Sequence, residues 1–220
     1  MFNSLREYII REPALQKGWG AYSHLVFAFI FSIAAIGLVA LAAWVLNEPA
    51  PVFTREPQQV LEGPFYVGSF SNLGGLIWFS AAAVLTFAAV LKRADRGALI
   101  LAAALTWAMG IDDIFMLHDR VYPKIFLSDP ILYALYFGTI GVIILRFHRQ
   151  IAFATLVGIV ITVAMWVLSA GIDELSNNPT WQLAEDGVKF IGIAVWAAAW
   201  IRQAFTDISK LIRAGMPTQA

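Results

Sequence analysis

The sequence contains no cysteine and few charged residues. Without cysteine the chain can form no disulfide, no thiolate metal site and no cysteine nucleophile. Charged residues make up 14% of the 220 positions and hydrophobic residues 60%, whereas about a quarter of a soluble domain is charged. The formal net charge is zero, so nothing indicates a nucleic-acid partner. This composition predicts a polytopic membrane protein in contact with the lipid bilayer.

A cleavable signal peptide is not expected, because the first twenty residues are polar and charged rather than one apolar run. Residues 1–23 are expected to form an interfacial helix and residues 202–220 a cytoplasmic tail. Between them the sequence predicts an all-α bundle of six transmembrane helices, residues 24–201, with a Pro-rich outer loop at 47–69. The expected spans are His24–Leu46, Phe70–Leu91, Ala98–His118, Ile131–Leu145, Ile151–Ile172 and Gln182–Ile201.

Basic residues gather in alternate connections between these spans, which predicts the orientation of the bundle. They lie in the N-terminal segment, in the loops after the second and fourth spans, and in the tail: Arg6, Arg11, Lys17, Lys92, Arg93, Arg96, Arg146, Arg149, Arg202, Lys210 and Arg213. The positive-inside rule then places both termini in the cytoplasm. A bacterial inner membrane is the expected location.

An internal repeat is also predicted. Gly110-Ile111-Asp112-Asp113 ends the third span and Gly171-Ile172-Asp173-Glu174 ends the fifth, each after a basic turn and a returning helix. The second and third spans would then form one hairpin and the fourth and fifth a parallel copy of it. The alternative is that two hydrophobic hairpins resemble each other by composition alone.

Acidic residues of three spans fall at one depth, in the half of the membrane away from the basic loops. A carboxylate at the bilayer centre costs about 2.5–3.5 kcal/mol, so such residues are functional candidates by default. Seven acids share this layer with Lys189 and His118. Protons, bound cations or water must neutralise the resulting excess of negative charge. The acids are Asp112, Asp113, Asp119, Asp173, Glu174, Glu185 and Asp186.

A divalent metal is one candidate for that neutralising charge. Carboxylates with one imidazole suit zinc, iron, manganese or calcium. The predicted metal ligands are Asp112, Asp113, His118 and Asp173. Glu185 and Asp186 are predicted catalytic residues together with Lys189, which follows them by four and three positions on one helix face. The alternative for these last three is a structural ion pair that fixes helix register.

The motifs Asp112-Asp113-x-x-x-x-His118-Asp119 and Glu185-Asp186-Gly187-x-Lys189 resemble those of uncharacterised bacterial multi-pass membrane proteins that carry both. The resemblance covers most of the chain from the second span onward and implies that the two motifs belong together. Alkaline ceramidases and adiponectin receptors offer a second comparison. This chain departs from that zinc hydrolase pattern, since it lacks a late His-x-x-x-His pair and has six predicted spans rather than seven.

Three functions fit these observations. The first is a metal-dependent enzyme with an outward-facing site that acts on an outer-leaflet lipid or another apolar substrate. The second is a non-catalytic metal- or ligand-binding subunit of a membrane complex or homo-oligomer. The third is a proton or cation transporter, which the nearly apolar inner halves of the spans disfavour. We favour the enzyme.

Overall fold

The computed structural model describes residues 23–49, 52, 61–64, 66, 68–125, 129–175 and 179–215. Contacts divide the chain into two compact units, Met1–Val67 and Gly68–Ala220. The first unit contains α2 (Ser23–Leu46), which agrees with the first expected span and includes the apolar helical stretch Ile36–Leu46. The expected interfacial helix and most of the Pro-rich loop lie outside the described residues. No strand occurs in the described ranges.

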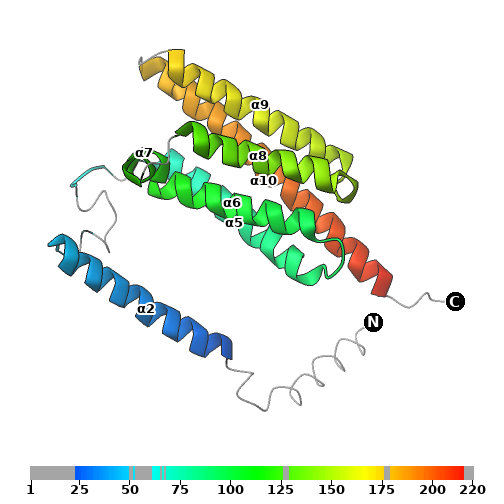
Figure 1. The fold of residues 1–220 in the computed structure, drawn as a ribbon, viewed down its shortest axis with the longest axis horizontal. Coiled ribbons are helices and arrows are strands. Elements are labelled where there is room, and N and C mark those ends of the chain that lie inside the picture. Colours follow the sequence, from blue (N-terminus) through cyan, green and yellow to red (C-terminus); the bar gives the residue numbers. More distant parts are fainter. Residues whose placement is uncertain are drawn as a thin grey trace. The chain divides into compact units, whose positions relative to one another are not determined.

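The second unit is a helical bundle, and its helices lie close to the expected spans (Figure 1). Helices α5, α6, α8, α9 and α10 are each long and apolar enough to cross a membrane. The chain is therefore an integral membrane protein. A sixth span, in α2, stays a prediction. The elements are α5 (Ser69–Leu91), α6 (Gly97–Phe115), α7 (Leu117–Arg120), η2 (Tyr122–Ile125), α8 (Asp129–Phe147), η3 (His148–Gln150), α9 (Phe153–Leu175) and α10 (Pro179–Gly215).

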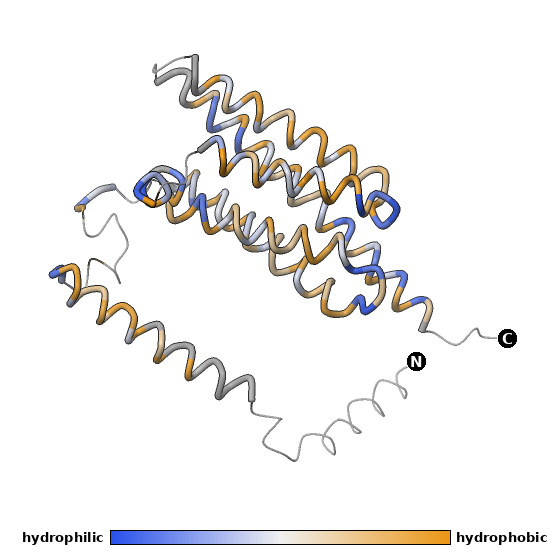
Figure 2. Tube along the Cα trace, in the orientation of Figure 1, coloured by the Kyte–Doolittle hydropathy of each residue, from blue (hydrophilic) through white to orange (hydrophobic). Residues whose placement is uncertain are grey.

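The core of this unit lies around α10. Helix α10 packs against α5 and α9, α5 packs against α6, and α8 packs against α6. Trp196 and Trp200 of α10 are fully buried, and the Trp196 indole N–H donates to Thr106 Oγ1 of α6 at 2.9 Å. Figure 2 shows apolar residues along most of these helices and hydrophilic residues at the turns after α5 and α8. The bundle therefore exposes its apolar surface where lipid would surround it.

The packing does not show the predicted repeat. Helices α5 and α6 pack against each other, but the main partner of α8 is α6 and the main partner of α9 is α10. The second and third spans thus form a closely packed hairpin that the fourth and fifth spans do not reproduce. The repeat stays a prediction from the sequence.

Helix α10 continues beyond the expected end of the last span at Ile201, because polar residues of its next turns are buried. Gln203 is 3% exposed: its Oε1 accepts the Ala152 N–H at 2.8 Å and its amide donates to the Gln150 carbonyl at 3.2 Å. Asp207 pairs with Lys92 at 2.8 Å. These contacts attach the extension of α10 to the turns before α9 and after α5. The segment expected as a tail is therefore helical through Gly215.

Close approach of α9 and α10 depends on Gly158. A Cβ at this position would lie 2.6 Å from the Ala199 Cβ. We expect Gly158→Ala to lower the free energy of unfolding by about 1–3 kcal/mol, the usual cost of overpacking. Gly141→Ala in α8 is the control, since nothing lies within 4 Å of its Cβ, and its effect should be neutral or stabilising. Unfolding in mixed micelles, followed by circular dichroism, measures both. Equal losses would contradict this account.

Candidate functional site

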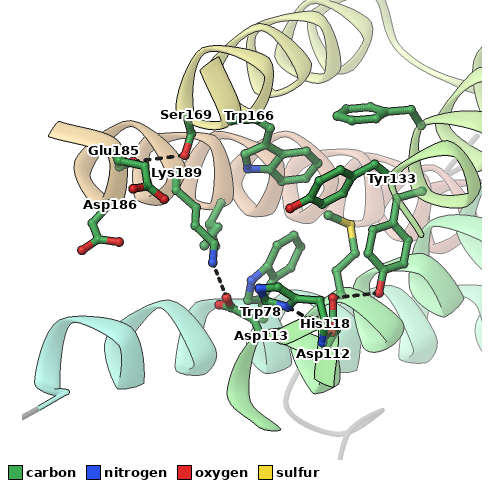
Figure 3. A pocket seen from close by; sticks show the side chains of 15 residues that line it. Trp78, Asp112, Asp113, His118, Tyr133, Trp166, Ser169, Glu185, Asp186 and Lys189 are labelled. Carbon is green, nitrogen blue, oxygen red and sulfur yellow. Dashed lines mark hydrogen bonds and ion pairs between the residues drawn. The ribbon is translucent and has the colours of Figure 1, made fainter. Parts of the chain in front are cut away.

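A cavity of about 440 Å³ lies between the ends of the helices that carry the predicted site residues (Figure 3). Five helices contribute to its wall, together with the short α7 that follows the break after α6. Its lining residues are Trp78, Met109, Asp112, Asp113, His118, Tyr133, Tyr136, Phe137, Trp166, Ser169, Ala170, Glu185, Asp186, Lys189 and Ile193. Acidic, basic and aromatic side chains thus meet in one place.

Asp112 is a buried carboxylate on the cavity wall. It is 5% exposed and its two carboxylate oxygens accept hydrogen bonds from two elements. Oδ1 accepts the backbone N–H of His118 at 2.8 Å and lies 3.2 Å from His118 Nδ1. Oδ2 accepts the Tyr136 hydroxyl at 3.1 Å. A buried carboxylate with these donors fixes the imidazole of His118 and the phenol of Tyr136.

The position of His118 depends on a break that the sequence did not predict. The third span was expected to remain helical through His118, but α6 ends at Phe115 because Met116 is left-handed, with φ 49° and ψ 42°. The left-handed conformation costs a non-glycine residue about 1–2 kcal/mol of free energy. The hydrogen bond from the His118 N–H to the buried Asp112 carboxylate offsets that cost. The turn brings His118 back onto Asp112.

Lys189 pairs across the bundle rather than along its own helix. Its Nζ lies 2.7 Å from Asp113 Oδ1, and the lysine and aspartate side chains are 40% and 14% exposed. The sequence spacing favoured Glu185 or Asp186 as its partner. The ion pair joins α10 to α6, and the two acids of α10 remain on the cavity wall beside it (Figure 3).

The cavity brings together most of the residues that the sequence singled out. Those lining it are Asp112, Asp113, His118, Glu185, Asp186 and Lys189. The fourth predicted metal ligand, Asp173, belongs to the last turn of α9, and its side chain lies outside the described part of the structure. The same holds for the side chains of Asp119 and Glu174. The roles assigned to these residues stay predictions.

A metal site has no support in the part of the chain that the structure describes. No group of three or more His, Asp or Glu side chains there could hold a metal ion. Asp112 and His118 are adjacent, but Asp113 is paired with Lys189. These residues supply two adjacent donors, fewer than the three protein ligands of a typical catalytic zinc site.

Several cavity residues were not predicted as site residues. Tyr133 and Tyr136 lie three positions apart in α8, so one helix face presents both, and that spacing was the available signal. Trp166 was interpreted only as a packing residue. Beyond the spans, burial and the neighbouring Asp112 carboxylate raise the pKa of Tyr122, so this phenol stays protonated near the site.

Trp78 places an unsatisfied donor on the cavity wall. Its side chain is 2% exposed and its ring centroid lies 5.7 Å from that of Trp166. Within the described ranges, its indole Nε1 is buried without a hydrogen-bond partner. Buried N–H groups without partners are rare and costly. Trp78 lines the same cavity as Asp113 and His118 (Figure 3).

No curated protein and no solved structure matches this chain. A family model described as a domain of unknown function, DUF8692, matches residues 29–202. The match includes α5 to α9 and every residue that lines the cavity. It covers well over half of the sequence, and on this basis the chain belongs to the DUF8692 family.

Proposed function

We propose that this chain is a membrane enzyme that acts on a lipid or another apolar substrate bound in the cavity. The observation that carries the proposal is the contact of His118 Nδ1 with the buried Asp112 carboxylate at 3.2 Å, on the wall of a 440 Å³ cavity. A carboxylate that orients an imidazole is a common arrangement for general acid–base catalysis. His118 is the proposed acid–base residue, and Asp112 is its positioning residue.

Roles for the other charged residues of the cavity follow from their positions on its wall. Glu185 and Asp186 are proposed as additional acid–base groups, since both line the cavity on α10. Lys189 Nζ is 2.7 Å from Asp113 Oδ1, and its remaining N–H donors are proposed to hydrogen-bond a substrate oxygen. Aromatic side chains of α5, α8 and α9 provide apolar surface for the substrate.

The metal-dependent form of this function remains a proposal. Asp112 and His118 would hold a divalent ion together with Asp173, and the ion would supply an activated water. Asp112 Oδ1 and His118 Nδ1 lie 3.2 Å apart, so this form needs a third ligand, the role proposed for Asp173. The ion pair of Asp113 with Lys189 speaks against Asp113 as a ligand.

The proposed site faces the extracytoplasmic side of a bacterial inner membrane. Basic residues at the opposite ends of the spans support this orientation through the positive-inside rule. Lys92, Arg93 and Arg96 follow α5, Arg146 lies in the last turn of α8, and Arg149 lies in η3.

The test is lipid turnover by the purified full chain. Wild-type protein is reconstituted with a bacterial polar lipid extract, and the lipids are analysed by mass spectrometry over time. We expect one lipid class to be consumed and its product to accumulate. A folded wild type that retains a lipid without changing it would instead indicate a binding subunit, and proton or cation flux without lipid conversion would indicate a transporter. Both outcomes contradict the proposal.

Elemental analysis of the same preparations tests the metal-dependent form. Wild type is compared with Asp112→Asn and Asp173→Asn. Near-stoichiometric metal that is lost in both folded variants would support a shared metal site. A folded, active and metal-free wild type would restrict the function to acid–base catalysis.

A further inference from the structure

The charges that line the cavity do not balance. Four carboxylates, those of Asp112, Asp113, Glu185 and Asp186, face one lysine and one histidine. Lys189 is paired with Asp113, and His118 contacts Asp112. Even with a protonated histidine, the lining residues carry more negative than positive charge. Asp186 is exposed and Lys189 is 40% exposed, so solvent screens part of this excess, but the net negative charge still attracts a cation to the cavity.

The wall of the cavity is rich in aromatic rings. Trp78 of α5, Trp166 of α9 and the phenols of Tyr133 and Tyr136 on α8 all line it, as does Phe137. The faces of such rings attract ammonium groups, and tryptophan does so most strongly. Acidic and aromatic side chains together are the usual surroundings of a bound amine or quaternary ammonium group.

The described part of the cavity wall also carries a polar group without a partner. The buried indole Nε1 of Trp78 has no hydrogen-bond partner among the described residues, although the ring belongs to the cavity wall. An indole N–H can only donate, so an acceptor, from water or from a ligand, would satisfy it. Trp200 Nε1, outside the cavity, is buried without a partner in the described ranges in the same way, so the Trp78 indole is compatible with a ligand but does not require one. A ligand that places an oxygen close to its cationic group supplies both features.

We propose that the cavity binds a cationic amine or quaternary ammonium group, carried by a lipid headgroup or by a free molecule. This inference rests on the proposed function in taking the cavity as the substrate site, and it names the substrate class. An anionic headgroup fits less well, because it would face four carboxylates while Lys189 is already paired.

Choline and its neutral isostere 3,3-dimethylbutanol test the proposal in the wild type. The full chain is placed in phosphatidylglycerol nanodiscs, and binding is measured by equilibrium dialysis against empty nanodiscs of the same lipid, so that choline attracted by the anionic headgroups is subtracted. We expect choline to bind about tenfold more tightly or better, since a desolvated cation–π contact and the carboxylates act only on the charged probe. Equal affinity for the two probes would overturn the proposal.

Charge-neutralising variants identify the site. Glu185→Gln with Asp186→Asn keeps side-chain shape, and we expect it to weaken choline binding about tenfold. Asp95→Asn is the matched control, because Asp95 lies in the turn after α5 and asparagine tolerates its left-handed φ of 50°. An unchanged affinity in the folded double variant would contradict the assignment.

Native mass spectrometry separates the two sources of the cation. The chain is reconstituted with equal parts phosphatidylcholine, phosphatidylethanolamine and phosphatidylglycerol. Selective retention of the amine-bearing lipids assigns a headgroup, and choline binding without such retention assigns a free cation. Retention of phosphatidylglycerol without choline binding overturns both. Turnover of a lipid that lacks a cationic group would keep the proposed enzyme and refute this inference, whereas choline binding without turnover would do the reverse.

Discussion

Replacement of His118 with glutamine is expected to lower the rate of lipid turnover by about 10²- to 10⁴-fold, the usual contribution of a general acid–base residue. Glutamine can still donate a hydrogen bond toward Asp112 but cannot accept and return a proton. The variant should therefore fold and bind substrate while its chemical step is slow. Initial rates in reconstituted vesicles, with binding measured separately, check this expectation.

The control is His148→Gln. His148 lies in η3, at the end of the bundle with the basic turns, and its Nδ1 contacts the Leu145 carbonyl. Its replacement should leave the turnover rate within about twofold, as is usual for surface substitutions. Similar losses in both variants would show that His118 has no special role.

The positioning role of Asp112 makes a prediction about pH. In Asp112→Asn the imidazole loses the adjacent negative charge that stabilises its protonated form. The base form is then available at lower pH, so the acid limb of the rate profile should move to lower pH while the maximal rate falls. A lower rate with an unchanged profile would indicate that Asp112 only maintains the fold.

Breaking the ion pair between Lys92 and Asp207 is expected to cause the largest loss of stability, about 2–4 kcal/mol for Lys92→Met. The two side chains are 16% and 6% exposed and lie 2.8 Å apart, so the substitution leaves a buried carboxylate without its partner. Unfolding in mixed micelles measures the loss. The double variant Lys92→Met/Asp207→Leu should regain much of it, because two apolar side chains leave no uncompensated charge.

Arg93→Met is the matched control for this pair. Arg93 is the next residue of the same turn and is exposed. Its substitution should change the free energy of unfolding by no more than about 0.5 kcal/mol. If Lys92→Met lowered the free energy of unfolding no more than Arg93→Met does, the ion pair would contribute nothing beyond a surface charge.

The helices were largely predictable, because length and hydropathy determine which segments can cross a bilayer. The boundaries of α5 and α9 lie within a few residues of those expected. The extension of α10 was missed, since its polar residues suggest a solvated tail. Only the fold shows that Gln203 and Asp207 are buried against turns from distant parts of the sequence.

The members of the candidate site were predictable, but most of their pairings were not. A charged residue within an apolar run is visible in the sequence, and this identified Asp112, Asp113 and Lys189. Their partners depend on which helices are neighbours and on the left-handed conformation of Met116. Spacing along one helix suggested that Lys189 pairs with Glu185 or Asp186, whereas the bundle places it against Asp113. Sequence patterns describe one helix at a time.

The two ion pairs of α10 together give this protein a characteristic hydrophobic thickness. Lys189 and Asp207 are separated by five helical turns, so they share one face and lie about 27 Å apart along the axis. Each joins α10 to the α5–α6 hairpin, one at either end of a stretch in which Arg202 is the single charged residue. That length is close to the hydrocarbon thickness of a typical bilayer, roughly 30 Å. In a much thicker membrane, either one ion pair would lie within the hydrocarbon or the bilayer would become thinner around the protein. The spacing of the pairs therefore matches the bundle to a bilayer of typical hydrocarbon thickness.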